Sequence, residues 1–521
     1  MNRNERGAEG GAMNRLWSYR GETFDELLRA LPTERAVPVP ASDEIIARVE
    51  AVSICSSDIK VVRMGRNHPL LADAGDAVDT VLGHEVCLRV HSVGDQQRSR
   101  FRPGDRLALQ PALVVDGKRS IIGMDRSGGF AQYMRLGPEA LPDHVMAMPE
   151  NVSAAAVALL EPYGCVERAW RPNVRLDLQP GGRALIVSVG RHAFDLKRLP
   201  GWSEVTVIGD VPPFLEAEEL KRAAGVGELE GQFDDILVLG DPDADTLSRI
   251  CMRLAVGGLL LQGRKAGSPG PVAIDPARVH YDRLSFLGTR SDDLSDALGP
   301  KAARFDARPG GVALVHGAGG AMGRIHVHRL LQLPDGPRSV IASSRKGKRL
   351  ADLEADFGPL ARANGRRLIV VEAEALDSAI AQHAPDGVDD IAVVAPDPAA
   401  IAAATGWLAP DGLLVLFAGF PYGTFLDVDL AAVALSGMRL TGSTGCTLDD
   451  MRDVFSRVSA GTLDLSANIA AVAGLDALPE ALKSVADGTV SGKIIIFPQK
   501  PDLAMFKVDN WAASDERNLT G

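Results

Sequence analysis

The chain has 521 residues, of which 46% are hydrophobic and 24% are charged, as in an ordinary soluble protein. Its 68 acidic residues outnumber its 56 basic residues and give a formal charge of -12, which argues against a nucleic-acid-binding surface. The nearest approach to a membrane span, residues 391–409, is interrupted by two prolines and an aspartate. The sequence therefore predicts a soluble protein of about two to four domains with no membrane or nucleic-acid partner.

The N-terminal residues 1–12 are charged and rich in glycine. They are predicted to be disordered, and they are not expected to be a signal peptide. The cysteines are scattered and have no paired spacing, which indicates reduced thiols in a cytoplasmic protein. Their positions are 55, 87, 165, 251 and 446.

The first predicted element that leads to a candidate functional residue is a strand over residues 43–52, which is followed by Cys55. A second segment carries His84 and Glu85. A thiolate, an imidazole and a carboxylate brought together suit zinc, and Asp58 could orient the imidazole. Taken singly, Cys55 could equally be a small buried apolar residue and His84 a core histidine.

Five segments in the first half of the chain occur in a fixed order: SICSSDIK at 53–60, LGHEV at 82–86, FRPGDRLALQ at 101–110, SGGFAQYMRL at 127–136 and LLEPYGCVERAW at 159–170. In this order and spacing they resemble the medium-chain, zinc-dependent alcohol and polyol dehydrogenases, and this resemblance favours the metal-binding interpretation of Cys55 and His84. With the coenzyme region, the resemblance covers about residues 35 to 498.

The resemblance implies a set of metal ligands. Cys55 and His84 would hold one catalytic zinc, with Glu161 as the third or an alternating ligand and Glu85 beside the metal. Cys165 competes with Glu161 for that role and is otherwise a buried packing residue. Relatives often carry a cysteine lobe for a structural zinc, but residues 111–127 contain no cysteine, so no structural zinc is expected. This segment would instead shape the substrate mouth or an oligomer contact.

The resemblance also implies catalytic roles around Ser57, which aligns with the hydroxyl that accepts a proton from the substrate alcohol. Family members often place a histidine relay three residues later, where this chain has Lys60. An ammonium could grip an anionic substrate group, so Lys60, with Arg63 and Arg66, favours a sugar phosphate or an acid. The alternative is a solvated basic loop.

The second half of the chain contains an internal repeat. Residues 234–265 echo residues 389–420, an offset of 389 − 234 = 155, and residues 285–296 echo residues 439–450. Strands alternating with helical stretches predict parallel, doubly wound sheets. The sequence thus predicts two Rossmann-type folds in tandem.

The two copies are predicted to differ. The span from Ala184 to Asp234 is 50 residues, whereas that from Ala313 to Asp389 is 76, so the first copy is expected to lack about one helix-and-strand unit. The turn after its first strand, VGRHAFDLKR, lacks the glycines that admit a pyrophosphate. Asp210 has the position of an NAD-binding acid, yet the first copy is interpreted as a degenerate, structural domain.

The second copy carries a glycine-rich turn between a predicted strand and a predicted helix, which favours a dinucleotide site. The turn ends in Gly320, Ala321, Met322 and Gly323 and begins at Gly317. The next strand ends in hydroxyl and guanidinium groups where an NAD-binding acid is usual, which suits the 2′-phosphate of NADP, although NAD stays open. These groups belong to Ser343, Ser344 and Arg345.

The predicted fold is α/β plus mostly β. A GroES-like barrel domain spans residues 13–178 and is completed by residues 445–521. The degenerate Rossmann-like domain spans residues 179–305, and the NAD(P)-binding domain spans residues 306–444.

The predicted function is hydride transfer between NAD(P) and a secondary alcohol or ketone of a polyol, sugar or sugar phosphate. A redox-neutral epimerase or isomerase and a non-catalytic scaffold are the alternatives. The proteins that the chain resembles are usually dimers or tetramers, so a homodimer or homotetramer is expected.

Overall fold

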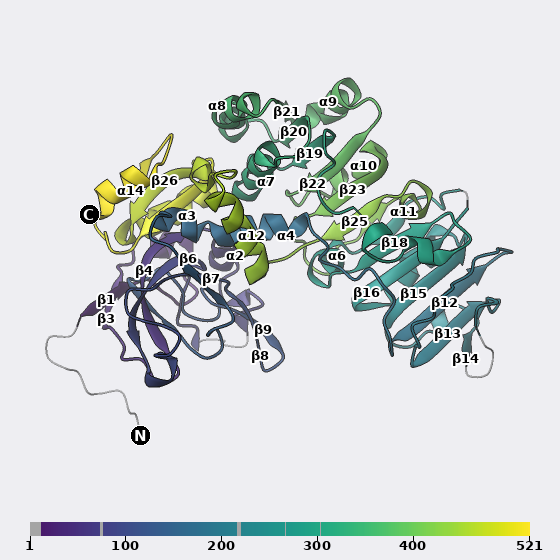
Figure 1. Cartoon of the computed structure of the whole chain (residues 1–521), viewed down its shortest axis with the longest axis horizontal. Coiled ribbons are helices and arrows are strands. Elements are labelled where there is room, and N and C mark those ends of the chain that lie inside the picture. Colours follow the sequence, from purple (N-terminus) through teal and green to yellow (C-terminus); the bar gives the residue numbers. More distant parts are fainter. Residues whose placement is uncertain (1–11, 73–76, 216–219, 266, 303) are drawn as a thin grey trace. The chain divides into compact units, whose positions relative to one another are not determined.

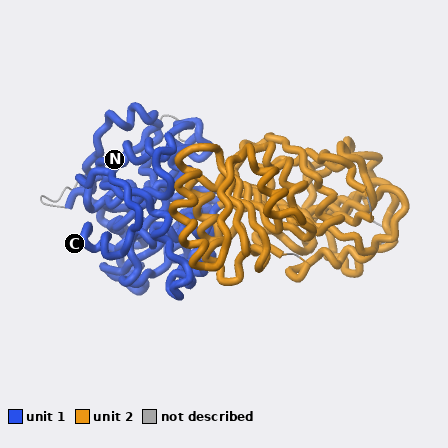
Figure 2. Tube along the Cα trace, turned by 90° about the horizontal axis from the view of Figure 1, so that it is seen from above, with its two compact units in different colours: residues 1–165, 445–521 blue, residues 166–444 orange. Residues whose placement is uncertain are grey.

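The computed structural model describes residues 12–72, 77–215, 220–265, 267–302 and 304–521. The chain divides into two compact units (Figure 2): unit 1 comprises residues 1–165 and 445–521, and unit 2 comprises residues 166–444. Both regions predicted as Rossmann-type folds thus lie in unit 2, and the first segment of unit 1 ends at residue 165. The predicted disordered segment lies outside the described residues, apart from residue 12.

Unit 1 is built on an eight-stranded sheet in which neighbouring strands are antiparallel, except for β26 and β27. The central strand β4 (Ile45–Ser53) is buried at most positions, because apolar residues occupy both of its faces. The C-terminal segment completes the sheet, since β27 (Lys493–Phe497) pairs with β4. The sheet order is β11 (Val145–Met148), β7 (Arg106–Leu109), β6 (Glu85–Val93), β4, β27, β26 (Ile469–Gly474) and β28 (Phe506–Lys507), and β10 (Tyr133–Leu136) also pairs with β4.

Shorter elements surround this sheet. Segment 111–127, which has no cysteine, contains the hairpin of β8 (Ala112–Val115) and β9 (Lys118–Ile121). The unassigned C-terminal extension contains β28 and the helix α14 (Ala513–Thr520). The other elements are β1 (Met13–Leu16), β2 (Ser18–Tyr19), β3 (Thr33–Ala36), β5 (Thr80–Val81), α1 (Phe24–Leu27), α2 (Ser56–Met64), α3 (Ala154–Ala158), α12 (Leu448–Ser459) and α13 (Leu478–Asp487), and α4 (Leu160–Ala169) runs from unit 1 into unit 2.

Unit 2 contains a twelve-stranded sheet whose strand order is symmetric about its centre. We call strands β12 to β18 the first half and β19 to β25 the second half. All neighbours within each half are parallel. The order is β14 (Leu220–Ala223), β13 (Glu204–Gly209), β12 (Arg183–Val189), β15 (Phe233–Gly240), β16 (Leu254–Gly263), β18 (Ser285–Thr289), β25 (Arg439–Gly442), β23 (Leu408–Leu416), β22 (Val388–Val393), β19 (Val312–His316), β20 (Ser339–Ser344) and β21 (Arg367–Glu372).

The two halves join through their last strands. β18 and β25 are antiparallel, with Phe286 opposite Leu440. A small two-stranded sheet joins the halves again, because β17 (Val272–Ile274) is antiparallel to β24 (Leu426–Val428). Each half therefore runs in the order 3-2-1-4-5-6 toward this junction, the order of a Rossmann-type sheet.

The same ion pair anchors each half. Arg175 Nη1 binds Asp235, and Gln179 N donates to the other oxygen of that carboxylate. In the second half, Arg304 Nη1 binds Asp390, and Arg308 N donates to Asp390 Oδ2. The spacing of the two arginines is 304 − 175 = 129, and that of the two backbone donors is 308 − 179 = 129. Equivalent residues thus make equivalent contacts, which supports the predicted repeat.

The halves differ in their helices (Figure 1). The expected loss of a helix-and-strand unit is wrong for the strand, because β14 is present. Instead, the connections from β12 to β13 and from β13 to β14 contain no helix among their described residues. The second half carries α7 (Ala321–Gln332), α8 (Lys348–Ala363), α9 (Leu376–His383), α10 (Pro398–Trp407) and α11 (Ala432–Leu435), whereas the first carries α5 (Ala244–Cys251) and α6 (Pro276–Tyr281).

Candidate active site and coenzyme site

Cys55 stands between β4 and α2 and caps the helix. Its backbone N–H donates to Asp58 Oδ2 at 2.8 Å, as a side chain at this helical position commonly accepts from the cap residue. Asp58 is fully buried, whereas Cys55 is half-buried. The first turn of α2 therefore fixes Asp58 and leaves the thiol of Cys55 at the end of the strand.

His84 lies between two of the predicted catalytic residues. Its Nδ1 is 3.4 Å from Asp58 Oδ1, and its Nε2 is 3.3 Å from Ser57 Oγ. Both Nδ1 and Asp58 Oδ1 are buried and have no hydrogen-bond partner among the described residues. Burial opposes protonation, but Asp58 and Cys55 raise the pKa of His84 well above its usual value. The ring thus has a carboxylate at one nitrogen and a hydroxyl at the other.

Glu85 makes an ion pair in the core of unit 1. Lys493 Nζ donates to both carboxylate oxygens, at 2.6 and 2.7 Å, and both side chains are almost fully buried. Burial disfavours the charged ammonium, but Glu85 and Cys55 together raise the pKa of Lys493. Lys493, which sequence reasoning missed, therefore compensates the charge of Glu85. Its only sequence signal is a lysine in the otherwise apolar strand IIIF.

The carboxylate of Glu161 contacts the thiols of two cysteines. Cys165 Sγ donates to Glu161 Oε1 at 3.2 Å, and Cys446 Sγ lies 3.9 Å from the same oxygen. Burial raises the pKa of Glu161, His84 opposes this rise and Glu85 adds to it. Cys165, predicted from the sequence to be a competitor of Glu161 or a buried packing residue, is half-buried and contacts Glu161 directly. Cys446 was not singled out from the sequence. No local motif marks Cys446, because it joins the others only through the fold.

The structure assembles these residues into two neighbouring sets of possible ligands. The donor atoms of Cys55, His84 and Glu85 lie within 4.8 Å of one another, and so do those of Glu161, Cys165 and Cys446. A set of sulfur, nitrogen and oxygen donors suits a zinc ion, and so does a histidine ring nitrogen that has no hydrogen-bond partner within the described chain, as at His84 Nδ1. The first set therefore brings together three of the four predicted metal ligands, whereas the fourth, Glu161, groups with the two thiols. Lys60 lies on α2 with an exposed side chain.

The glycine-rich turn of the second half leads from β19 into α7. Gly317 has a φ of +90°, and a Cβ there would lie 2.6 Å from Ala395 N. A Cβ on Gly323 would lie 2.2 Å from Gly317 O, so both positions require glycine sterically. At Gly320, the cap of α7, the nearest atom to such a Cβ is 3.6 Å away. The chain itself does not need glycine at Gly320, which fits a diphosphate approaching the helix end there.

The predicted 2′-phosphate residues are partly accessible. Ser343 is fully buried, and its hydroxyl lies 3.3 Å from His316 Nδ1. Ser344 is half-buried and Arg345 is exposed. Arg349 was not identified from the sequence. Burial lowers the pKa of its guanidinium group, and the positive charge of Arg345 lowers it further, which places the two side chains close together. Two guanidinium groups therefore concentrate positive charge beside Ser344.

A Cβ on Gly319 would lie 2.8 Å from Ser344 Oγ and 3.2 Å from Arg349 Cβ. The glycine-rich turn thus packs directly against the residues that carry this charge. Ala321 and Met322 form the first turn of α7.

The corresponding crevice in the first half is filled by its own chain. His192 Nε2 lies 2.9 Å from Ser188 Oγ. Phe194 is 2% exposed, and a Cβ on Gly263, where β16 ends, would lie 3.0 Å from its ring. The loop that follows β12 thus lies across the carboxyl end of the sheet, where Rossmann-type folds bind nucleotides.

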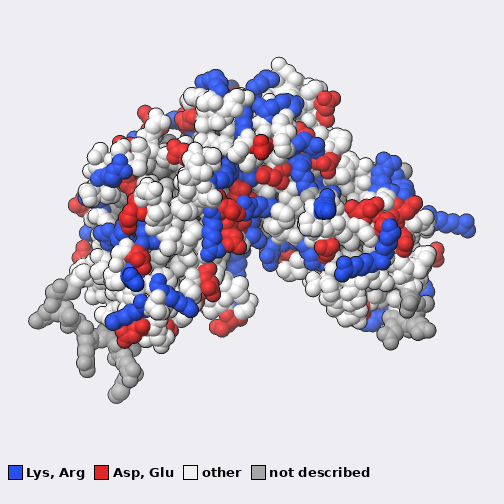
Figure 3. Space-filling view, in the orientation of Figure 1, with Lys and Arg blue, Asp and Glu red and all other residues white. Residues whose placement is uncertain are grey.

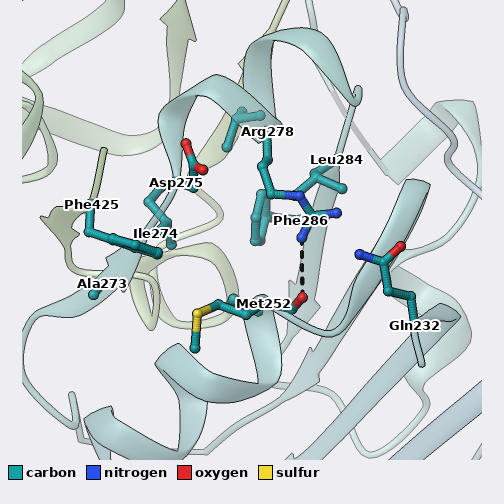
Figure 4. Close-up of a pocket in the computed structure, with 11 residues that line it drawn as sticks. Gln232, Met252, Ala273, Ile274, Asp275, Arg278, Leu284, Phe286 and Phe425 are labelled. Atoms are coloured by element: carbon teal, nitrogen blue, oxygen red, sulfur yellow. Dashed lines mark hydrogen bonds between the residues drawn. The ribbon is translucent and has the colours of Figure 1, made fainter. Parts of the chain in front are cut away.

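A pocket of about 240 Å³ in unit 2 is lined by residues of the first half together with Phe425 of the second half (Figure 4). Ile274, Phe286 and Phe425 give it apolar walls. Its charged residues are already engaged, because Arg278 donates to the backbone of Met252 and Asp275 accepts from Gly423 N. The pocket therefore offers apolar surface and does not coincide with the thiol or glycine-turn sites.

On the face seen in Figure 3, basic and acidic side chains are intermixed. Within the described residues, no helix is long and apolar enough to cross a bilayer.

The profile of the alcohol dehydrogenase GroES-like domain matches residues 41–150. The chain is 26% identical over 170 residues to L-galactonate-5-dehydrogenase of Escherichia coli K12, covering 30% of this chain and 45% of that protein. It is 27% identical over 162 residues to L-sorbose 1-phosphate reductase of Klebsiella pneumoniae, covering 29% and 40%. The chain thus matches less than half the length of these two relatives.

Among solved structures, the chain resembles a protein of Sinorhizobium meliloti 1021 assigned as a zinc-binding dehydrogenase and crystallised with NADP. The TM-score is 0.53 at 17% identity, covering 94% of this chain and 100% of that one. This likeness shows that the two proteins share a fold. Together with the matched domain and the similar sugar dehydrogenases, it leads to one conclusion: residues 41–150 form an alcohol dehydrogenase GroES-like domain, and the chain is similar over part of its length to sugar and polyol dehydrogenases.

Proposed function

We propose that the protein is a zinc-dependent oxidoreductase that moves a hydride between NADP and a secondary alcohol or ketone of a polyol, sugar or sugar phosphate. The observation that carries this proposal is the arrangement at His84, where Asp58 stands at one ring nitrogen and Ser57 at the other, beside the thiol of Cys55. This arrangement leaves an imidazole fixed for metal binding and a hydroxyl next to the site. Relatives that act on sugar acids and sugar phosphates, by their names, support the substrate class.

Each residue has a physical role in this proposal. Cys55 and His84 would hold zinc, with Glu161 as the third ligand, directly or through water. A bound zinc ion would act as a Lewis acid on the substrate oxygen. Asp58 orients the imidazole, and Ser57 Oγ accepts the proton of the substrate hydroxyl. Glu85 is already neutralised by Lys493, so we assign it a place beside the metal rather than on it.

The coenzyme would bind at the second half of unit 2. Gly317 and Gly323 shape the turn, and the open space at Gly320 admits the diphosphate. Ser344 and Arg345, with Arg349, supply the hydroxyl and guanidinium donors that suit a 2′-phosphate, and no acid occupies the end of β20. This is why we favour NADP over NAD.

We infer that the first half is structural. His192 and Phe194 fill its crevice, and its contacts with the second half are reciprocal. Gly288 meets Ala434, while the equivalent Gly442 meets His280, with offsets of 442 − 288 = 154 and 434 − 280 = 154. Reciprocal contacts are the signature of a two-fold interface between like subunits. The first half therefore covers, within one chain, the sheet edge that β25 would otherwise expose.

The substrate class rests partly on α2. Arg63 donates to Ala486 O and Arg66 to Arg20 O, whereas Lys60 has an exposed side chain. Lys60 is therefore our choice to contact a phosphate or carboxylate of the substrate, while Arg63 and Arg66 hold the surrounding chain.

The test combines metal analysis, coenzyme titration and turnover. Purified protein should contain zinc, bind NADPH and change NADPH absorbance with ketoses or their phosphates. Cys55→Ser should lose the metal at this site and all turnover but keep NADPH binding. Gly320→Val should lose NADPH binding and keep the metal, and Asp210→Ala should keep both. Turnover without net absorbance change would indicate an epimerase, and absence of both metal and nucleotide would indicate a scaffold; either result refutes the proposal.

A further inference from the structure

A second set of metal donors lies at the place where the chain passes between its two units. The first segment of unit 1 ends at Cys165, and the chain returns to unit 1 at Gly445, next to Cys446. Both thiols belong to unit 1 and contact one carboxylate, that of Glu161. The two connections between the units are therefore brought together by three potential ligands.

The geometry of this set is compact. The three donor atoms lie within 4.8 Å of one another, and both sulfurs approach the same oxygen, Glu161 Oε1. A Cβ on Gly164 would lie 3.2 Å from Cys446 Cβ and 3.4 Å from its sulfur, so glycine at this position leaves room for Cys446. Glu161 and Cys446 are buried, and Cys165 is half-buried. Helix α4 supplies two of the donors one turn apart, and the returning chain supplies the third.

The chemistry of these donors favours a metal over a reactive thiol pair. Buried thiols with a carboxylate nearby are held protonated, which makes them poor nucleophiles and slow to oxidise. A borderline-soft divalent ion would favour the deprotonated thiols. It displaces both thiol protons, and the two thiolates balance its charge. Two sulfurs and one oxygen are a suitable set for zinc, with a water completing four ligands.

We propose that Glu161, Cys165 and Cys446 form a second zinc site, distinct from the ion held by Cys55 and His84, which joins the two connections between the units. Binding one Zn²⁺ releases two protons, one from each thiol. The two oxygens of Glu161 allow its carboxylate to serve both ions. This proposal does not depend on the hydride-transfer reaction, because its donors are assembled within unit 1 whether or not a coenzyme binds.

The test counts metal ions in the full-length protein, stripped with a chelator and reloaded with Zn²⁺ or Co²⁺. Wild type should hold two ions per chain. Cys446→Ser and Cys165→Ser should each hold one, and Cys55→Ser should also hold one. Cys251→Ser, a buried cysteine outside both donor sets, should hold two. Circular dichroism verifies that each variant is folded.

Cobalt provides a readout independent of activity, because cobalt thiolates absorb in the near ultraviolet. Cys55→Ser should keep the absorption due to two thiolates, and the double variant Cys165→Ser, Cys446→Ser should keep that of one. Wild type with a single ion, or a Cys446→Ser variant that still binds two, would overturn the proposal. So would a Cys165–Cys446 disulfide found by mass spectrometry in the metal-free protein before any oxidant is added.

The outcomes separate this site from the proposed function. If Cys55→Ser holds one ion while wild type shows no reaction with any sugar, the second site stands and the oxidoreductase proposal fails. If Cys55→Ser holds no metal ion while wild type reduces ketoses, the oxidoreductase proposal stands and the second zinc site is refuted.

Discussion

Phe286 and Leu440 lie opposite each other where the two halves of the twelve-stranded sheet meet, and they occupy the same position in each half. Phe286 pairs with Leu260 of its own half, and Leu440 pairs with Leu414. A residue that faces its own equivalent lies on a two-fold axis. The β17–β24 ladder agrees, because Val272 pairs with Val428 and Ile274 with Leu426 about a central Ala273–Asp427 pair. The internal repeat thus forms a symmetric interface within one chain.

The first prediction tests this junction. A Cβ on Gly288 would lie 2.9 Å from Ala434 Cβ and 3.0 Å from its backbone. We expect Gly288→Val to destabilise unit 2 by about 1–3 kcal/mol through overpacking, and the reciprocal Gly442→Val to do the same. Urea unfolding measures the loss. Gly406→Ala, in open space on α10, is the control and should be neutral or slightly stabilising. Unchanged stability of both valine variants would contradict the symmetric interface.

The second prediction concerns the buried ion pair of Glu85 and Lys493. Lys493→Met leaves a carboxylate buried without its partner, which costs about 3–5 kcal/mol. The double variant Glu85→Gln, Lys493→Met removes both charges and should recover most of that stability. Thermal unfolding of the two variants decides the matter. Equal destabilisation in both would mean that packing, rather than charge, makes Lys493 important.

The third prediction concerns NADP selectivity. Arg345→Ala should weaken NADPH binding by about tenfold or more, the loss expected from a charged hydrogen bond, and leave NADH binding unchanged. Isothermal titration measures both. Lys346, the next residue along, pairs with Glu372 at 3.3 Å, so Lys346→Ala is the matched control and should change neither affinity. An equal loss for both coenzymes would indicate damage to the fold instead.

The fourth prediction is a pH dependence. Burial, reinforced by Arg329, lowers the pKa of His326 to about 3. His326 accepts from Trp170 Nε1 at 3.1 Å as a neutral ring. Since the unfolded chain protonates this histidine near its usual pKa of about 6.5, stability is full above that pH and falls as the pH drops toward 3.

The fall attributable to His326 amounts to about 2 kcal/mol between pH 6.5 and 4.5. His326→Gln should reduce this acid sensitivity while costing stability at neutral pH. Denaturant unfolding at several pH values gives the slope, and an unchanged slope in the variant would contradict the assignment.

The fifth prediction concerns the C-terminal extension. Glu516 accepts from Ala154 N at 2.5 Å and from Ala155 N at 3.0 Å, so α14 caps the start of α3. Glu516→Ala should destabilise unit 1 by about 1–3 kcal/mol, because two buried donors lose their acceptor. Glu516→Gln should cost less, and Ser514→Ala, exposed on the same helix, should cost nothing. Differential scanning calorimetry distinguishes the three.

The sequence by itself determined the features written in short stretches of chain. Cys55, Ser57 and Asp58 lie within one helical turn of each other, and the glycines at 317, 320 and 323 follow one another closely. These short motifs, with the family resemblance that they carry, indicated the chemistry of the residues. The repeat was also visible from sequence, because an offset of about 155 residues persists through each half. Local order needs only neighbouring residues, which a sequence displays directly.

Only the tertiary structure decided which distant residues meet. Lys493 reaches Glu85 from a strand 408 positions away, and Cys446 joins Glu161 across the whole of unit 2. Likewise, Ser343 was predicted to be one of the groups that suit a 2′-phosphate, but its side chain is buried against His316. Strand pairing and the return of the chain to unit 1 bring these groups together, and the burial that makes their charges and thiols matter exists only in the packed fold.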